Sequence, residues 1–145
     1  MSYATAPVTM WFDQRIVLRR SPIHGLGTYA TDAIGAGELL ILVTGGIVFS
    51  QQEWDAGNIQ LEAEMYNQER LPDGRFVVTP KLFHYYVNHS CEPNIVDLAR
   101  NPSATQYAAI RDIRAGEELT ADYYTEATLA ACACGLPRCR WTKTQ

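Results

Sequence analysis

The sequence predicts a single mostly-β domain built from several short strands and few helices. A length of 145 residues fits one domain. Apolar and polar residues alternate in several short segments, and glycine or proline interrupts the chain between them. Because 47% of the residues are hydrophobic and 19% are charged, the chain can bury a core and does not resemble a disordered protein.

The first half of the chain is expected to contain four short strands. Alternating segments at 14–20 and 27–31 indicate the first two, and Ser21-Pro22 ends the first of them. The apolar stretch 38–49 is expected to form two more strands, separated by Gly45-Gly46.

The middle of the chain is expected to begin with a helix. Ser50 followed three residues later by Glu53 forms a capping-box pattern, which opens helices. A second helical fragment is expected within 61–69. The remaining strands are expected at 71–78, which an Asp-Gly turn opens, at 106–110 and at 118–123.

Two short segments resemble each other. Residues 34–39 read Ile-Gly-Ala-Gly-Glu-Leu, and residues 113–117 read Ile-Arg-Ala-Gly-Glu. Both place a glycine before a predicted strand, so we interpret them as similar turns within one domain. The predicted organisation is an N-terminal extension at 1–12, loose over its first ten residues, a main domain at 13–125 and a tail at 126–145.

Composition and charge exclude several classes of protein. The net charge of −4 argues against direct nucleic-acid binding, and it suits a basic peptide partner, although such a balance is also ordinary. The N-terminus lacks a basic segment followed by an apolar run, so no signal peptide is expected. The apolar stretch 39–49 is shorter than the roughly 20 residues that span a membrane. We therefore expect an intracellular protein without membrane contact.

The four cysteines favour a zinc site over disulfides. An even count allows two bridges, but a Cys-x-Cys pair without an export signal favours metal. The tail offers three thiolates, and structural zinc takes four ligands. A site closed by sulfur must use the one remaining cysteine and would tie the tail to segment 88–94. The expected ligands of one structural Zn²⁺ are Cys91, Cys132, Cys134 and Cys139.

Two other motifs have more than one reading when taken singly. Gly25-Leu26-Gly27 is either a tight turn or a loop whose missing side chains let the backbone approach a ligand. Asn88-His89-Ser90 is formally a glycosylation sequon, which the absence of an export signal disfavours.

Taken together, the motifs resemble those of SET-domain protein-lysine methyltransferases. Segment 88–94, Asn-His-Ser-Cys-Glu-Pro-Asn, is similar to the family signature Asn-His-Ser-Cys-x-Pro-Asn. Segment 116–123, Gly-Glu-Glu-Leu-Thr-Ala-Asp-Tyr, resembles the strand Gly-Glu-Glu-Leu-Thr-Phe-Asp-Tyr. The glycine loop at 25–27 stands where the family carries its first cofactor loop, and the cysteines of the tail resemble the post-SET zinc loop. The resemblance runs from about Arg15 to Trp141.

This resemblance implies a β-clip SET fold of several small twisted sheets with short helices. Its C-terminal segment threads beneath an earlier loop in a pseudoknot-like arrangement, and a zinc-bound post-SET tail closes the domain. The SET domain would occupy 13–125 and the post-SET tail 126–145. Short viral and bacterial members are the nearest in size, so a homodimer is possible, because a small domain lacks flanking domains to cover its hydrophobic surface.

The resemblance also assigns the co-substrate S-adenosylmethionine and the residues that would hold it. The glycine loop would bind its methionine part, and segment 88–89 would contact its amino-acid and adenine ends. Trp141 would pack against the adenine or would serve only as a hydrophobic anchor for the tail. The candidate cofactor-binding residues are His24, Gly25, Leu26, Gly27, Asn88, His89 and Trp141.

Tyr123 is the catalytic residue that the resemblance implies. A neutral lysine amine of a histone or another basic protein would attack the sulfonium methyl in line. Free lysine has a pKa near 10.4, and burial and the nearby cation would lower it. A phenol beside the methyl would align it, and a dry channel would hold the reactants. The zinc would have no part in this step.

Several positions depart from the family pattern. Ala121 replaces the usual Phe or Tyr, so we expect a pocket that permits di- or trimethylation, unless Tyr124 or another aromatic fills the space. Tyr86 is expected to line the same channel. Tyr85 replaces an Arg or His and leaves one cofactor contact open, and segment 50–79 gives no substrate identity.

Two other functions remain as alternatives. A SET-like module could bind a peptide or partner without turnover; the retained tyrosine, Asn-His pair and cysteines argue against it, whereas Ala121 and Tyr85 leave it open. A zinc-clipped β-domain without cofactor is the third reading, which binding of S-adenosylmethionine would exclude.

Overall fold

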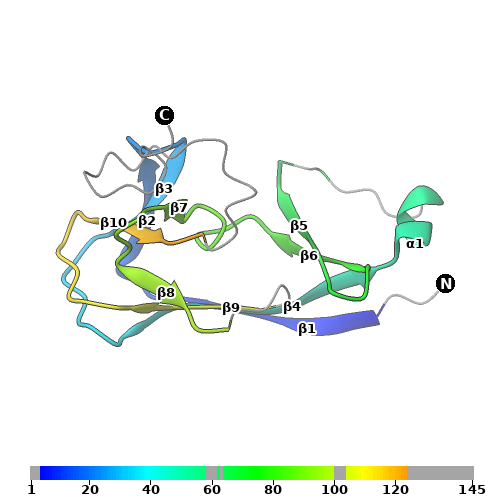
Figure 1. Ribbon diagram of the computed structural model, residues 1–145, viewed down its shortest axis with the longest axis horizontal. Helices are drawn as coiled ribbons and strands as arrows, with labels where there is room; N and C mark the ends of the chain where they lie inside the picture. Colours follow the sequence, from blue (N-terminus) through cyan, green and yellow to red (C-terminus); the bar gives the residue numbers. More distant parts are fainter. Residues whose placement is uncertain (1–3, 58–61, 63, 100–103, 124–145) are drawn as a thin grey trace.

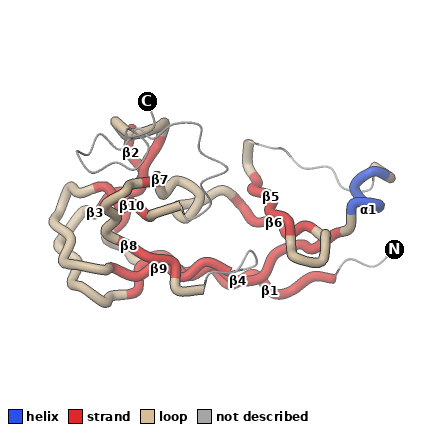
Figure 2. Tube along the Cα trace, in the orientation of Figure 1, coloured by secondary structure: helices blue, strands red, loops and turns tan. Residues whose placement is uncertain are grey.

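The computed structural model describes residues 4–57, 62, 64–99 and 104–123, with side chains from residue 9 onward. Strands dominate it, as predicted, and they form two sheets (Figures 1 and 2). The elements are β1 (Ala4–Phe12), β2 (Ile16–Arg20), β3 (Leu26–Ala30), β4 (Leu39–Phe49), α1 (Gln51–Asp55), β5 (Tyr66–Arg70), β6 (Phe76–Pro80), β7 (Asn88–His89), β8 (Ile95–Asp97), β9 (Ala104–Ala109) and β10 (Glu118–Ala121).

The larger sheet is organised around the long strand β4. Its strand order is β5-β6-β4-β9-β8, and β1 also pairs with β4. The first half of β4 pairs with β9 and its second half with β6, all antiparallel. In Figure 1, β1, β4 and β9 run along the base of the molecule, and the β5–β6 hairpin lies at the same end as α1.

The glycine pair in β4 does not divide the strand, contrary to the prediction of two strands at 38–49. β4 is continuous over 11 residues and contains both glycines. A Cβ at Gly46 would lie 2.7 Å from the carbonyl oxygen of Val78. The missing side chain therefore lets β6 approach, which is a role of glycine inside strands as well as between them.

The smaller sheet places the last described strand between two earlier ones. Its order is β2-β3-β10-β7, with β10 antiparallel to β3 and parallel to β7. Beyond β7 the chain returns to β10, where the Asn94 side chain donates to the Glu118 carbonyl and accepts from the Thr120 amide, both at 2.8 Å. Segment 88–94 thus lies along β10 and is bonded to it at both ends. The place of β10 between β3 and β7 is consistent with the SET fold that the resemblance implies.

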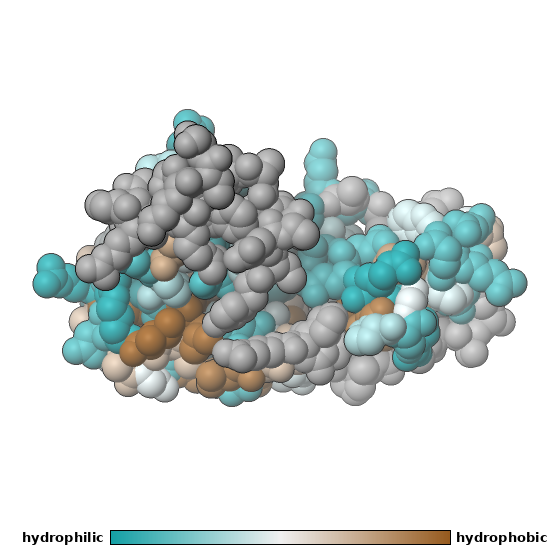
Figure 3. Space-filling view, viewed as in Figure 1, coloured by the Kyte–Doolittle hydropathy of each residue, from teal (hydrophilic) through white to brown (hydrophobic). Residues whose placement is uncertain are grey.

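A continuous hydrophobic core joins the two sheets. A smaller cluster under the hairpin consists of Phe49, Phe76 and Val78, with Tyr66 packed against it. On the face shown in Figure 3, hydrophilic residues cover most of the end that contains the β5–β6 hairpin and α1. The larger cluster contains Ile16, Ala30, Ile34, Leu40, Ile41, Val43, Val87, Ile95, Ala109, Ile113, Leu119 and Ala121.

The two similar turns predicted from the sequence lie side by side. Ile34 and Ile113 exchange backbone hydrogen bonds of 2.9 and 2.8 Å. In each turn a glutamate carboxylate accepts the backbone N–H three residues earlier: Glu38 from Gly35 at 2.5 Å and Glu117 from position 114 at 2.6 Å. The turns are therefore matching local structures that meet at one isolated bridge.

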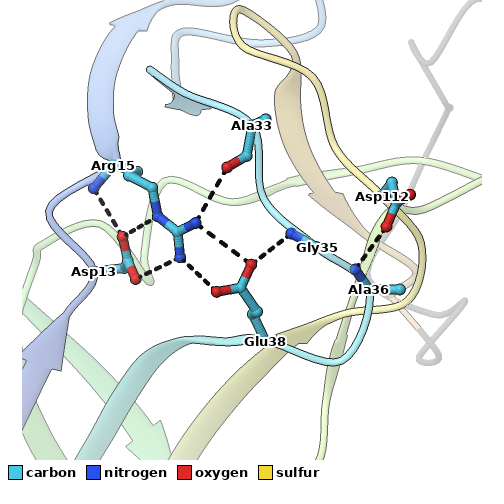
Figure 4. Close-up of polar contacts among 7 residues, drawn as sticks. All are labelled: Asp13, Arg15, Ala33, Gly35, Ala36, Glu38 and Asp112. Atoms are coloured by element: carbon cyan, nitrogen blue, oxygen red, sulfur yellow. Dashed lines mark hydrogen bonds and ion pairs between the residues drawn. The ribbon is translucent and has the colours of Figure 1, made fainter.

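Arg15 connects the first of these turns to the end of β1. Its guanidinium donates to the Asp13 carboxylate at 2.8 Å and to Glu38 at 3.0 Å (Figure 4). It also donates to the Ala33 carbonyl at 3.1 Å. The guanidinium lowers the pKa of both carboxyl groups, chiefly through these side-chain hydrogen bonds.

The structure corrects two of the predicted local elements and confirms a third. The predicted loose N-terminus is wrong over 4–10, because residues 4–12 form β1. The predicted helical fragment at 61–69 is wrong over 66–69, which belong to β5, and neither β7 nor β8 was expected. The Ser50–Glu53 capping box is present, with N–H to oxygen distances of 3.1 and 2.8 Å. No helix among the described residues is long and apolar enough to cross a membrane.

His84 introduces a polar group into the interior. Both of its ring nitrogens are buried without a hydrogen-bond partner among the described residues, and its ring stacks on Phe12 at 6.1 Å. Burial lowers the pKa of His84 from 6.5 to about 4. The folded protein therefore holds this imidazole neutral where an unfolded chain would protonate it.

This burial predicts acid sensitivity. Between pH 6.5 and about 4 the unfolded chain binds a proton at His84 that the folded chain does not. The free energy of unfolding therefore falls by about 2–3 kcal/mol in total as the pH is lowered through this range. His84→Phe should remove that part of the loss in urea unfolding measured from pH 7 to pH 4.5. His24→Gln, at an exposed position, is the control and should not change it. An unchanged pH dependence in His84→Phe would contradict the assignment.

Candidate functional site

Asn88 joins the glycine loop to the threaded strands. It lies on β7, is 8% exposed, and its amide nitrogen donates to the carbonyls of His24 at 3.0 Å and Leu26 at 3.2 Å. The same nitrogen lies 2.9 Å from the Glu118 carboxylate. Three acceptors around one atom identify it as the nitrogen of the carboxamide rather than its oxygen.

The two glycines of this loop have different structural roles. Gly25 has a φ of +46°, a left-handed conformation that other residues adopt at a cost. Gly27 is buried, and a Cβ there would lie 2.8 Å from Cδ of Glu118 and 3.1 Å from Cβ of Ser21. The space at Gly27 is therefore filled by a carboxylate of the protein itself. His24 and Leu26 are exposed residues, but their backbone carbonyls accept from the buried Asn88 amide.

The Glu118 carboxylate was not singled out by the sequence analysis. It accepts hydrogen bonds from the hydroxyl of Ser21 at 2.8 Å and from that of Tyr29 at 3.0 Å, in addition to Asn88. The only signal in the sequence is its place as the second glutamate of Gly-Glu-Glu.

His89 and Tyr123 meet on the other side of Asn88. His89 is 5% exposed, and its Nδ1 accepts the backbone N–H of Tyr123 at 3.0 Å. A neutral imidazole that accepts at Nδ1 carries its proton on Nε2, which lies 3.4 Å from Sγ of Cys91. The two rings lie 5.3 Å apart. In this tautomer His89 contacts the Tyr123 backbone through Nδ1 and lies beside the Cys91 sulfur through Nε2.

The Tyr123 phenol is held in its protonated form. Its hydroxyl donates to the carbonyl oxygen of Val87. Burial is the main cause that raises the pKa of Tyr123, and the nearby Tyr85 and Glu118 raise it further. At neutral pH the group can therefore donate a hydrogen bond or orient a neighbour, and it does not act as a base.

The three candidate channel residues have different environments. Ala121 is 5% exposed and belongs to the larger hydrophobic cluster, against which Tyr107 also packs. Tyr86 is half-buried, and its ring lies edge-on to Tyr85 at 5.1 Å. Tyr107 is thus an aromatic beside the Ala121 cluster that the sequence analysis did not identify. Tyr124 lies outside the described residues.

The predicted metal site is represented in the structure by Cys91 alone. Cys91 is half-buried at the end of segment 88–91. Within the described part of the chain, no three His, Cys, Asp or Glu side chains are grouped to hold a metal ion. The other predicted contributors lie outside the described residues: Cys132, Cys134, Cys139 and the candidate cofactor residue Trp141.

The chain is similar to known proteins over most of its length. The SET domain family matches residues 25–124. A histone-lysine N-methyltransferase of Arabidopsis thaliana is 32% identical over 142 residues, which are 89% of this chain and 13% of the relative. Trithorax, a histone-lysine N-methyltransferase of Drosophila virilis, is 32% identical over 152 residues, 97% of this chain and 4% of the relative.

A yeast relative is also similar to most of this chain but is much longer. The histone-lysine N-methyltransferase of Saccharomyces cerevisiae that is specific for lysine 4 of histone H3 is 30% identical over 150 residues, 86% of this chain and 13% of the relative. The chain thus spans only a small part of the length of these relatives.

Proposed function

Because the chain belongs to the SET-domain family, we propose that it transfers methyl groups from S-adenosylmethionine to the ε-amine of lysine in a protein. A histone or another basic protein inside the cell is the substrate class that the relatives and the acidic net charge of −4 favour. The observation that carries the proposal is the position of two neighbouring residues of β7: Asn88 bonds the glycine loop, and His89 bonds the backbone of Tyr123.

The chain's own residues have separate tasks in this proposal. The backbone from His24 to Gly27 and the Asn88 carboxamide would bind the methionine part of S-adenosylmethionine, which supplies an activated methyl group. His89 keeps Tyr123 in place through its backbone. The Tyr123 phenol, protonated and directed at a backbone carbonyl, aligns the reacting groups and excludes water. The gain comes mainly from this orientation. The lysine amine attacks after its proton has passed to solvent, and the S–CH₃ bond breaks as the N–CH₃ bond forms, so Tyr123 does not act as the base.

The first test of the proposal replaces the phenol. Tyr123→Phe should lower kcat by about 100-fold or more, because it removes the hydroxyl and leaves the ring. The measurement is transfer of labelled methyl from S-adenosylmethionine to mixed histones and cell lysate. Tyr66→Phe is the matched control, since Tyr66 packs against the separate hairpin cluster. Cofactor binding without any transfer by the wild type would favour the partner-binding module, and no cofactor binding would favour the zinc-clipped domain.

The second test concerns the number of methyl groups. Ala121 is smaller than the Phe or Tyr that is usual at this position, so the wild type should form di- and trimethyl-lysine, and Ala121→Phe should shift the product toward monomethyl-lysine. Mass spectrometry of the modified substrate distinguishes these products. If the wild type forms only monomethyl-lysine, the pocket is not permissive; Tyr107, which packs on the same cluster, or Tyr124 would then be the residue to replace.

We also propose that one structural Zn²⁺ is bound by Cys91, Cys132, Cys134 and Cys139. The support is the Cys-x-Cys-x4-Cys pattern of the tail, together with a fourth cysteine that follows His89. The zinc would order the tail near the site, where Trp141 could then reach the cofactor, and it would take no part in methyl transfer. A possible homodimer remains a prediction.

The zinc proposal predicts one zinc per chain in elemental analysis of the purified protein. Cys91→Ser should lower that content and the thermal stability, since structural zinc contributes to folding. Ser90→Ala, one residue away, is the control for a local packing change. Two disulfides found by mass spectrometry under non-reducing conditions would contradict the zinc site.

A further inference from the structure

Glu118 collects hydrogen bonds from three separate parts of the chain. Its carboxylate accepts from Ser21 at the end of the β2 region, from Tyr29 on β3 and from Asn88 on β7. Each partner is neutral, and Glu118 forms no ion pair with the described residues. The carboxylate therefore acts as a hydrogen-bond acceptor at both of its oxygens. A neutral carboxamide of the same shape would replace one of these acceptors with a donor.

The bond from Ser21 connects Glu118 to the shape of the glycine loop. Because the Ser21 hydroxyl donates its one hydrogen to Glu118, its lone pairs are left for the loop, and the amide of Ile23 donates to them at 3.0 Å. The Ser21 amide in turn donates to the Gly25 carbonyl at 2.7 Å. Glu118 thus determines the hydroxyl orientation on which the turn depends.

The bond from Asn88 connects Glu118 to the orientation of the carboxamide. A carboxamide nitrogen has two hydrogens, and here they are shared among the Glu118 carboxylate and the carbonyls of His24 and Leu26. The charged acceptor is the strongest of the three. It therefore directs the nitrogen of Asn88 inward and the oxygen to the opposite side.

The absent side chain of Gly27 shows that the loop is built around this carboxylate. A Cβ at that position would meet Cδ of Glu118 at 2.8 Å. Neither group can move without affecting the other, because Glu118 starts β10 and Gly27 lies within β3, and these two strands are paired.

We propose that Glu118 is a positioning residue for binding of S-adenosylmethionine: it holds the Ser21–Gly27 loop and the Asn88 carboxamide in their binding geometry. This inference depends on the function proposed above, in which that loop and Asn88 receive the methionine part. Glu118 acts through these groups and does not take part in the methyl-transfer step, which belongs to Tyr123. Its loss should therefore weaken cofactor binding much more than it lowers the maximal rate.

The test compares two adjacent glutamates. Glu118→Gln keeps the size of the side chain but presents an N–H₂ group to the donors, so cofactor affinity measured by calorimetry should fall by about tenfold or more. At saturating cofactor, kcat should stay within about threefold of the wild type. Glu117→Gln is the matched control: Glu117 pairs with Arg111 and accepts from the Arg114 amide, away from the loop, so its loss should leave cofactor affinity unchanged.

A second readout does not depend on cofactor. Hydrogen exchange at the Ile23 amide should accelerate in Glu118→Gln and not in Glu117→Gln, because only the first releases the Ser21 hydroxyl. Ser21→Ala and Tyr29→Phe each remove one donor from Glu118 and should weaken cofactor binding by a smaller factor. They decide the question if Glu118→Gln does not fold.

The outcomes separate this inference from the function on which it depends. If the wild type binds S-adenosylmethionine and Glu118→Gln binds it equally well, the positioning role is refuted and the proposed function stands. If the wild type binds no S-adenosylmethionine, both are refuted. If Glu118→Gln loses kcat as strongly as affinity, the residue acts on the transfer step and the positioning role is wrong.

Discussion

The insertion of β10 between β3 and β7 brings together segments that lie far apart in the chain. β10 has only four residues, yet it pairs with strands that precede it by about 30 and 90 positions in the chain. Asn94 supports the arrangement, because its side chain bonds two backbone groups of β10, the Glu118 carbonyl and the Thr120 amide. A buried backbone without such partners would be costly, so segment 88–94 and β10 must form together.

This insertion explains why the candidate site is assembled from distant segments. Both sides of β10 contact functional groups: β3 continues from the glycine loop, and β7 is the Asn-His pair itself. Asn88 and His89 are neighbours in sequence, and their side chains bond opposite parts of the site, the loop at one end and Tyr123 at the other. One two-residue strand therefore couples the proposed cofactor surface to the proposed catalytic tyrosine.

The charged groups near this strand system divide into two kinds. Glu38 and Glu117 close turns and pair with arginines, so they stabilise local structure at the surface. Glu118, adjacent to Glu117, instead accepts from neutral donors in the interior of the site. Glu117 belongs to the turn that precedes β10, whereas Glu118 is the first residue of the strand, so the two side chains meet different partners.

Local patterns in the sequence were enough to predict the class of fold, several of the strands and the candidate residues. Alternation revealed β2, β3, β9 and β10, and the capping box revealed the start of α1, because these patterns are local. Asn88, His89 and Tyr123 could be selected because they stand in short motifs that resemble a known family. Short segments such as β7 and β8 carry too few residues for a periodic signal.

Features that depend on partners far away in the chain could not be predicted from these local patterns. The continuity of β4 through Gly46 depends on the approach of β6, and the strand at the N-terminus depends on pairing with β4. The Glu118 carboxylate fills the space that Gly27 leaves, although the two residues are about 90 positions apart. A sequence shows which side chains are present, whereas hydrogen bonds between strands far apart in the chain are set by how the strands pair.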